Sequence, residues 1–305
     1  MAAALPPCHP IRGSTALVGV LGDPVRHSLS PAMHNAALAA LGLDWAYLAL
    51  PVPAERFAAV VDSLETLGCR GLNVTLPHKQ AACALAAERS PLAARLGAVN
   101  TLVPRPQGGW LGANTDVEGF SAPLRQHGDD WRGRRAVVLG CGGSARAVVA
   151  ALADLGVEEI LLAGRRQEPL EAFQAACRPW APQLRPLLWN GEGALLQPLA
   201  TADLVVNTTP VGMASGRDPA AVDACPLEEA ELEALGTGCW VYDLIYTPRP
   251  TRLLREAARR GCPTVDGLEM LVQQGAAALR LWSGRPEVPV AAMRQAALLE
   301  LEQRP

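Results

Sequence analysis

Lysine is almost absent from this chain of 305 residues. Lysine and arginine together number 27, and Lys79 is the only lysine among them. Ordinary composition would place about 19 lysines in a chain of this length. Arginine can replace lysine in most surface roles, but its guanidinium group does not release a proton near neutral pH. The single lysine is therefore a candidate for proton chemistry. Composition alone is equally consistent with a surface lysine that is present by chance.

Other shortages exclude whole classes of protein. No apolar run reaches the roughly 18 residues that a membrane-spanning helix needs. Residues 1–10 hold no basic segment followed by an apolar stretch, so no secretory signal is visible. The net charge of −3 and the pI of about 6.0 give no bulk attraction to nucleic acid or anionic lipid. We expect a cytoplasmic protein with neither a membrane nor a nucleic-acid partner.

Paired cysteines are also missing. The eight cysteines are scattered, none of them forms a C-x-x-C motif, and no Cys/His cluster has the spacing of a zinc site. We therefore expect free thiols in a reducing compartment and no bound metal.

Half of the residues are hydrophobic, which excludes intrinsic disorder, and the length suggests two domains. Short apolar runs alternate with amphipathic segments, a pattern typical of parallel sheets covered by helices on both faces. The predicted strands are 15–22, 45–52, 71–76, 99–103, 110–111, 135–139, 160–163, 204–207, 239–243 and 263–265. The predicted helices are 30–41, 54–67, one from Pro77, 144–155, 169–177, 250–260, 268–282 and 290–302, and the segment 214–238 is predicted to be a loop with a short helix.

A glycine-rich turn lies between the strand 135–139 and the helix after it. The segment satisfies G-x-G-x-x-A, in which the first glycine permits a tight turn, the second lets a pyrophosphate approach the backbone, and Ala145 permits close helix–strand packing. The free N–H groups and the dipole of the helix N-terminus favour an anion there. A purely structural glycine turn is the alternative. A dinucleotide pyrophosphate would be bound by Gly140, Cys141, Gly142, Gly143 and Ser144.

The end of the next strand indicates which dinucleotide is bound. An NAD site carries a carboxylate there for the ribose 2′-hydroxyl. This strand ends instead in Gly164, Arg165 and Arg166, and two guanidinium groups suit a 2′-phosphate. We predict NADP, with a solvated basic turn as the alternative.

Hydroxyl groups follow the first strand. Ser28 and Ser30 stand at the mouth of the helix 30–41, where they could bind a carboxylate. The alternative is ordinary capping, with Ser30 at the N-cap and Pro31 in the first helical position.

Further polar residues are predicted at the carboxyl edge of the first sheet, where ligands bind in open α/β folds. Thr75 ends the strand 71–76, and Lys79 follows in the next helical turn. Asn100 and Asp116 lie at later strand or loop ends, and each taken alone is equally consistent with a turn or cap residue.

The string NVTLPHK at 73–79, together with SLSP at 28–31, resembles the shikimate dehydrogenase family. The resemblance covers about residues 16–282. Further matching strings are GAVNT at 97–101, NTD at 114–116, NTTPVGM at 207–213, DLIYTP at 243–248 and DGLEMLVQQ at 266–274.

This resemblance implies a reversible, NADPH-dependent reduction of 3-dehydroshikimate to shikimate in chorismate and aromatic amino acid biosynthesis. It implies that Lys79 is the acid/base residue, with Asp116 as its partner, and that Leu244 and Gly267 line the nicotinamide. It implies small-molecule partners and is compatible with a homodimer. The substrate would be bound by Ser28, Ser30, Thr75, Asn100, Asp116, Tyr246 and Gln274.

The resemblance also implies the fold. We expect an α/β protein in which residues 1–128 form a three-layer substrate domain with a mainly parallel sheet. Residues 129–266 would form a Rossmann-type NADP domain, and the helices of 267–305 would return to the first domain.

The sequence departs from the family at one site. Members commonly carry Asn-Arg-Thr after the second Rossmann strand and a basic residue three positions later. Here these positions hold Gly164, Arg165, Arg166 and Pro169. Two rival functions remain open: a quinate/shikimate dehydrogenase with broader substrate or cofactor use, and a non-catalytic metabolite-binding homologue.

Overall fold

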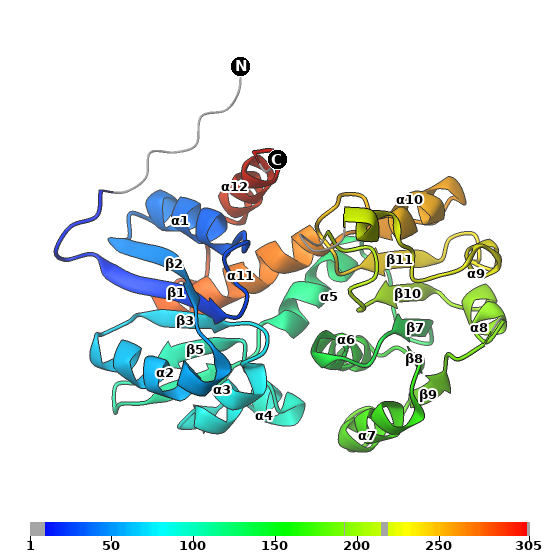
Figure 1. The fold of residues 1–305 in the computed structure, drawn as a ribbon, viewed down its shortest axis with the longest axis horizontal. Coiled ribbons are helices and arrows are strands. Elements are labelled where there is room, and N and C mark those ends of the chain that lie inside the picture. The colour runs from blue at the N-terminus through cyan, green and yellow to red at the C-terminus, as the bar shows by residue number, and fades with distance from the viewer. Residues whose placement is uncertain (1–9, 192, 215–218, 304–305) are drawn as a thin grey trace. The chain divides into compact units, whose positions relative to one another are not determined.

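The computed structural model describes residues 10–191, 193–214 and 219–303. The chain forms two compact units (Figure 1). The first contains the chain up to Thr115 and again from Val272 onward, and the second is Asp116–Leu271. The sequence placed these boundaries at 128/129 and 266/267, so the observed first unit is shorter at both junctions.

The first unit contains a sheet of six strands in the order β2-β1-β3-β5-β6-β4. Its strands are β1 (Ala16–Gly22), β2 (Trp45–Pro51), β3 (Gly71–Val74), β4 (Glu88–Arg89), β5 (Thr101–Pro104) and β6 (Trp110–Ala113). β1 runs parallel to β2 and β3, whereas β5 is antiparallel to both of its neighbours. The hairpin between β5 and β6 turns at Gly108 and Gly109, whose φ angles of 87° and 72° favour glycine. The predicted mainly parallel sheet and its hairpin are therefore present, with β1–β2, β1–β3 and β4–β6 as the parallel pairs.

Helices from both ends of the chain complete this unit. They are α1 (Ser30–Leu41), η1 (Ala54–Arg56), α2 (Phe57–Thr66), α3 (Lys79–Leu85), α4 (Pro91–Leu96), α12 (Val290–Glu302) and α11 (Gly267–Ser283), the last from Val272 onward. α12 packs along α1. The C-terminal helices thus return to the first unit, as predicted.

The N-cap of α1 lies one residue earlier than the sequence suggested. The N-cap is Leu29, and Ser30 is already the first helical residue. The prediction of Ser30 as N-cap was wrong because the Ser28 hydroxyl accepts the Ser30 N–H at 3.1 Å and starts the turn upstream. The helix ends at Gly42, whose φ of 64° gives the left-handed C-cap expected there.

Trp282 of α11 anchors that helix to the sheet. Its indole Nε1 donates to the Leu102 carbonyl at 3.1 Å. The indole lies so close to Gly71 of β3 that a Cβ atom at this glycine would collide with it. The docking of α11 therefore requires a glycine in β3.

Replacement of Gly71 by alanine should destabilise the protein by about 1–3 kcal/mol, because the extra methyl group overpacks this contact. Urea unfolding measures the loss. Gly13→Ala is the matched control, since nothing lies within 4 Å of a Cβ atom there. Equal stability of the two variants would refute this account of the docking.

The second unit is a fully parallel sheet in the order β12-β11-β10-β7-β8-β9. Its strands are β7 (Arg135–Leu139), β8 (Glu159–Gly164), β9 (Leu184–Leu188), β10 (Leu204–Asn207), β11 (Trp240–Asp243) and β12 (Thr264–Val265). β7 and β10 are central, and the chain winds outward from them in both directions, which is the order of a doubly wound dinucleotide-binding sheet. The predicted Rossmann-type fold is confirmed.

The helical elements of this unit are α5 (Asp116–Gln126), α6 (Gly143–Asp154), α7 (Gln167–Cys177), α8 (Leu196–Ala200), η2 (Pro219–Asp223), α9 (Glu229–Glu233) and α10 (Arg252–Arg259). The central strands are nearly continuous apolar runs, as parallel strands buried on both faces require. One core cluster joins Val137, Leu139, Val205, Val241 and Leu253.

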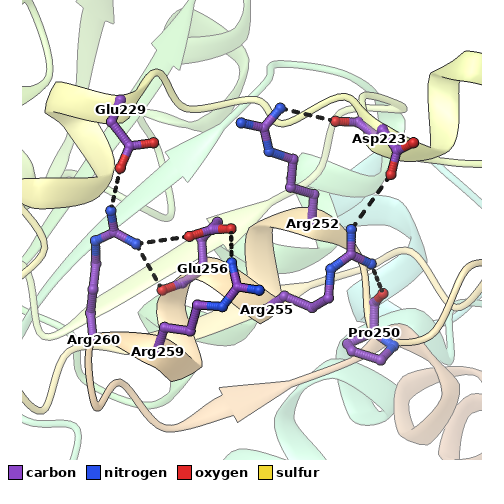
Figure 2. A network of polar contacts seen from close by, with 8 residues as sticks. All are labelled: Asp223, Glu229, Pro250, Arg252, Arg255, Glu256, Arg259 and Arg260. Carbon is purple, nitrogen blue, oxygen red and sulfur yellow. Dashed lines mark hydrogen bonds and ion pairs between the residues drawn. The ribbon is translucent and has the colours of Figure 1, made fainter.

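An arginine-rich network ties the surface segments of this unit together (Figure 2). Four arginines on or next to α10 pair with acidic and carbonyl groups of η2, α9, α10 itself and Pro250 just before it. The residues are Asp223, Glu229, Pro250, Arg252, Arg255, Glu256, Arg259 and Arg260. Exposed pairs of this kind contribute at most about 1 kcal/mol each. The network links η2 and α9 to α10.

Candidate functional site

The first group of candidate residues lies at the carboxyl ends of β1 and β3. From β1 the chain passes to β2 on one side and then to β3 on the other, so a topological switch point lies between β1 and β3. Thr75 donates its N–H to the Leu21 carbonyl at 2.9 Å. A Cβ atom at Gly22 would collide with the Thr75 methyl group, so glycine there lets Thr75 cover the end of β1. Thr75 is half-buried at this switch point.

Lys79 is the first residue of α3, not a residue inside a helix that starts at Pro77. A turn closed by the His78 N–H on the Thr75 carbonyl at 2.9 Å precedes it. The Lys79 carbonyl accepts the N–H of Val99 at 2.9 Å. The helix dipole opposes a positive charge at this end, so the ammonium group does not serve to stabilise α3. Half-buried Lys79 is thereby held close to both Thr75 and the segment between α4 and β5 that contains Asn100.

Asn100 is buried, with 3% exposure, and its amide has a defined orientation. Its Oδ1 accepts the Thr115 N–H at 2.8 Å and the Thr101 hydroxyl at 2.9 Å. Its Nδ2 donates to Thr115 Oγ1 at 3.1 Å. Because a backbone N–H can only donate, the contact with Thr115 fixes Oδ1 and Nδ2 in this order.

The hydrogen bonds around Asn100 continue to Tyr47 of β2. Asn73 Nδ2 donates to the Asn100 carbonyl and to Thr101 Oγ1, both at 3.3 Å. Asn73 Oδ1 accepts the hydroxyl of fully buried Tyr47 at 2.7 Å. Asn100 is thus joined to two residues to which the sequence assigned no role.

Gln274 lies on α11 within the first unit and is 9% exposed. Its neighbour Gly275 faces α1 and α12 closely. A Cβ atom at Gly275 would lie 3.2 Å from His34 Nε2 and 3.2 Å from Met293 Cε. Gly275 thus lets α11 pack closely against α1 and α12, and this packing buries the neighbouring Gln274.

In the second unit, the glycine turn after β7 has the geometry of an anion site. Gly140 has a φ of 97°, and a Cβ atom there would lie 2.9 Å from Thr209 Cγ2. Gly142 and Gly143 have open space where Cβ atoms would be, and α6 begins at Gly143 without a side-chain cap. Ala145 is fully buried against the sheet. An uncapped helix N-terminus behind an open glycine cradle fits a pyrophosphate group.

Arg165 and Arg166 are both exposed directly after β8. Arg166 is the N-cap residue of α7 and makes no side-chain capping bond. A Cβ atom at Gly164 would lie 2.9 Å from Leu170 Cδ2, so this glycine allows α7 to pack against the end of β8. Two guanidinium groups and no carboxylate at this strand end fit the 2′-phosphate of NADP.

Leu244 and Gly267, expected to line the nicotinamide, are in direct contact within the second unit. A Cβ atom at Gly267 would collide with the Leu244 carbonyl, and the Gly267 N–H donates to the Ile245 carbonyl at 3.1 Å. Only glycine fits here without a shift of backbone. The structure therefore brings these two residues together.

Asp243 joins the two loops that follow β10 and β11. It is fully buried, and it accepts the Thr251 hydroxyl at 2.7 Å, the Asn207 Nδ2 at 3.0 Å and the Ile245 N–H at 3.1 Å. Asn207 in turn accepts the Thr209 hydroxyl at 2.7 Å. Both residues belong to strings that match the family, but the sequence did not predict this bridge between them.

Burial raises the pKa of the Asp243 carboxyl from 3.8 to about 6, although its hydrogen bonds oppose the shift. The folded state therefore binds this proton more tightly than the unfolded state, and its stability should rise as the pH falls from about 6 toward 4. A shift of about two pKa units corresponds to about 3 kcal/mol.

Asp243→Asn should remove this pH dependence. Relative to the variant, the wild type should gain about 2 kcal/mol in free energy of unfolding between pH 7 and pH 4. Urea titrations at several pH values measure it, and parallel curves for the two proteins would contradict the assignment.

Two candidate residues of the substrate set belong to the second unit. Asp116 is the first residue of α5, and Tyr246 follows β11; both are half-buried. All the candidate dinucleotide residues lie in this unit, whereas Ser28, Ser30, Thr75, Lys79, Asn100 and Gln274 lie in the first.

Two kinds of feature are absent from residues 10–191, 193–214 and 219–303. None of the helices there has the length and apolar character of a membrane-spanning segment. No group of three or more His, Cys, Asp or Glu side chains in this part of the chain could hold a metal ion.

Known proteins match segments near both ends of the chain and more than nine-tenths of its length. Residues 20–102 match the shikimate dehydrogenase substrate binding domain, and residues 267–298 match the shikimate 5′-dehydrogenase C-terminal domain. A shikimate dehydrogenase (NADP(+)) of Trichormus variabilis is 48% identical over 289 residues, covering 94% of this chain and 97% of the relative. The chain belongs to the shikimate dehydrogenase family.

Solved structures of the family share the fold. Shikimate 5-dehydrogenase of Thermus thermophilus, in complex with NADP(H) and shikimate, has a TM-score of 0.80 and 38% identity, over 94% of this chain and 100% of that one. Quinate dehydrogenase of Corynebacterium glutamicum, in complex with NAD, has a TM-score of 0.82 and 32% identity, over 93% and 99%. Family membership, predicted from the sequence strings, is confirmed.

Proposed function

We propose that this protein is an NADP-dependent oxidoreductase that reduces 3-dehydroshikimate to shikimate reversibly, a step of chorismate and aromatic amino acid biosynthesis. The observation that carries the proposal is the placement of the single lysine. Lys79 begins α3 directly after the turn that follows Thr75, and its carbonyl accepts the N–H of Val99, the neighbour of Asn100. Relatives named as NADP(+)-dependent shikimate dehydrogenases support both the reaction and the cofactor.

In the substrate half, the hydroxyls of Ser28 and Ser30 bind the carboxylate. The ring hydroxyls are held by amide and hydroxyl groups, which can donate or accept, and by a carboxylate, which accepts. These groups belong to Thr75, Asn100, Asp116, Tyr246 and Gln274.

In the cofactor half, the turn from Gly140 through Cys141, Gly142 and Gly143 to Ser144 holds the pyrophosphate. Arg165 and Arg166, after Gly164, bind the 2′-phosphate, and Leu244 and Gly267 line the nicotinamide. When bound, NADPH supplies the hydride that reduces the substrate carbonyl carbon.

Lys79 completes the reaction with a proton. In reduction its ammonium group donates to the carbonyl oxygen, which becomes the alcohol, and in the reverse direction the amine accepts that proton. Its positive charge also stabilises the developing alkoxide. Asp116 is the partner that orients and balances this charge.

An absorbance assay at the NADPH band, run as a grid of two substrates and two cofactors, tests the function. Shikimate with NADP should give the highest kcat/KM, because the end of β8 carries two arginines and no carboxylate. Faster turnover of quinate with NAD would favour the activity named for the Corynebacterium glutamicum enzyme. Absence of turnover in every arm would favour a metabolite-binding homologue. A cytoplasmic location and a homodimer stay predictions.

A further inference from the structure

Two buried side chains connect the loops that follow β10 and β11 in the second unit. Asn207 and Asp243 are both 0% exposed, and Asn207 Nδ2 donates to Asp243 Oδ1 at 3.0 Å. The same carboxylate oxygen accepts the Ile245 N–H at 3.1 Å. We call Asn207 and Asp243 the loop bridge.

One end of the loop bridge is fixed to the glycine turn after β7. Asn207 Oδ1 accepts the Thr209 N–H at 3.0 Å and the Thr209 hydroxyl at 2.7 Å. The Thr208 hydroxyl donates to the Leu139 carbonyl at 2.7 Å. A Cβ atom at Gly140 would lie 2.9 Å from Thr209 Cγ2 and 3.0 Å from Thr208 Oγ1. The loop after β10 therefore packs directly on the turn.

The other end of the loop bridge is fixed to the two residues expected to line the nicotinamide. The Leu244 N–H donates to the Asn207 carbonyl at 3.1 Å. The Ile245 carbonyl accepts the Gly267 N–H at 3.1 Å, and a Cβ atom at Gly267 would collide with the Leu244 carbonyl. The wall made by Leu244 and Gly267 is thus held at a set position relative to the glycine turn.

Each atom of the loop bridge has one possible role. The Thr209 N–H can only donate, so the Asn207 amide turns Oδ1 toward Thr209 and Nδ2 toward Asp243. A carboxylate has acceptor atoms alone, and the Asp243 Oδ2 accepts the Thr251 hydroxyl at 2.7 Å. The Thr251 oxygen in turn accepts the Leu254 N–H at 3.4 Å and caps α10. The Asp243 Oδ1 therefore joins the two loops, whereas Oδ2 holds α10.

We propose that Asn207 and Asp243 are positioning residues for the dinucleotide, because they fix the nicotinamide wall relative to the turn that binds the pyrophosphate. The inference rests on the proposed function, in which Leu244 and Gly267 line the nicotinamide and the turn at Gly140 holds the pyrophosphate. Both positioning residues are fully buried, so neither reaches the cofactor itself. Their effect is on how well the nicotinamide fits once the pyrophosphate is bound.

A fragment of the dinucleotide distinguishes this role from a merely structural one. 2′-Phospho-ADP-ribose keeps the pyrophosphate and the 2′-phosphate of NADP but lacks the nicotinamide. Loss of the loop bridge should weaken NADP binding and spare the fragment, because the Thr208 hydroxyl still holds its loop on the glycine turn. A merely structural role would weaken the binding of both ligands equally, or of neither.

Asp243→Ala tests the inference in the full-length protein, with isothermal titration calorimetry of both ligands. The Kd for NADP should rise about three- to tenfold, as expected for one net hydrogen bond between the loops. The Kd for 2′-phospho-ADP-ribose should stay within twofold. Thr251→Val is the matched control, since it removes the contact of Oδ2 and the cap of α10 but leaves the loop side intact. Both of its Kd values should stay within twofold of the wild type.

Asp243→Asn separates the loop bridge from the buried charge. The amide oxygen can still accept from Asn207 and Ile245, and the amide nitrogen can donate to the Thr251 oxygen. The conservative variant should therefore rescue NADP affinity to within twofold of the wild type. A loss as large as that in Asp243→Ala, or equal losses for NADP and the fragment in Asp243→Ala, would overturn the proposal.

A second variant keeps the test decisive if Asp243→Ala does not fold. Asn207→Asp retains an acceptor for Thr209 but sets a second carboxylate against Asp243, and the two repel each other. It should also raise the Kd for NADP about three- to tenfold, as the loss of one net hydrogen bond predicts, and spare the fragment. Adding Asp243→Asn should restore part of the affinity, because its amide can donate to the new carboxylate. An unchanged Kd for NADP in Asn207→Asp overturns the inference.

The wild type separates failure of this inference from failure of the proposed function. A wild type that binds NADP and turns over shikimate, with variants that keep its ratio of the two Kd values, contradicts the loop bridge alone. A wild type that neither binds NADP nor turns over shikimate contradicts the proposed function and the inference with it.

Discussion

Lys79→Arg is expected to lower kcat by about 100-fold or more with little change in either KM, because a positioned general acid or base contributes typically 10²–10⁴-fold. The guanidinium group keeps the positive charge but cannot release a proton near neutral pH. Initial-rate kinetics with shikimate and NADP measure the loss. Lys79→Ala removes charge and proton together, so the difference between the two variants isolates the electrostatic part.

The neighbouring position offers a control for this experiment. Gln80 is exposed on the same turn of α3, and Gln80→Arg adds a guanidinium group there without touching Lys79. Its turnover should stay within twofold of the wild type. Near-wild-type turnover in Lys79→Arg would eliminate the acid/base role and leave only stabilisation by charge.

The double variant Arg165→Ser/Arg166→Ser should raise the KM for NADP about 100-fold and leave the KM for NAD unchanged. Hydrogen bonds to charged groups contribute about 1.5–3 kcal/mol each, so the loss of two gives at least about two orders of magnitude. The NADP/NAD preference would collapse as a result. A KM for NADP that does not move would show that the basic pair is a solvated turn.

Single variants divide this effect between the two arginines. Arg166 stands where family members commonly carry threonine, at the N-cap of α7, so its share shows whether it replaces the missing basic residue. Arg178→Ser is the matched control, because Arg178 is exposed at the opposite end of the same helix.

Hydrophobic periodicity predicted the elements that bury a regular face. The strand 204–207 and the helix 290–302 agree with β10 and α12 to the residue, and β7 agrees likewise. Glycines that have positive φ in the structure indicated the C-terminal end of α1 and the turn of the β5–β6 hairpin. These features are local, so a single sequence contains the information that specifies them.

Short or irregular elements were not predicted from the sequence. β4, α4, β9 and α8 are two to six residues long, and so carry too few positions to show a period. α5 was missed because Gly119 and Pro123 interrupt its pattern. Because α5 was not recognised, the sequence placed the end of the first unit at residue 128. The structure places it at Thr115, since α5 belongs to the second unit. Residues 215–218 of the predicted loop lie outside the described part of the chain.

In the candidate site, too, some residues could be predicted from the sequence and others could not. Motif strings predicted the residues that would touch ligands, such as Lys79 and Gly140, because chemistry restricts residue type and spacing. Tyr47 and Asp243 were not singled out, because the partners of each lie far away in the chain. Only the fold shows that Tyr47 faces Asn73, or that Asp243 bridges to Asn207.

The division of the chain also has a consequence during synthesis. The second unit is one continuous stretch, whereas the first is built from both ends of the chain. As the ribosome releases the polypeptide, the second unit can fold before Trp282 is available to pack on Gly71. The half made first is thus completed last, when α11 and α12 are added to it.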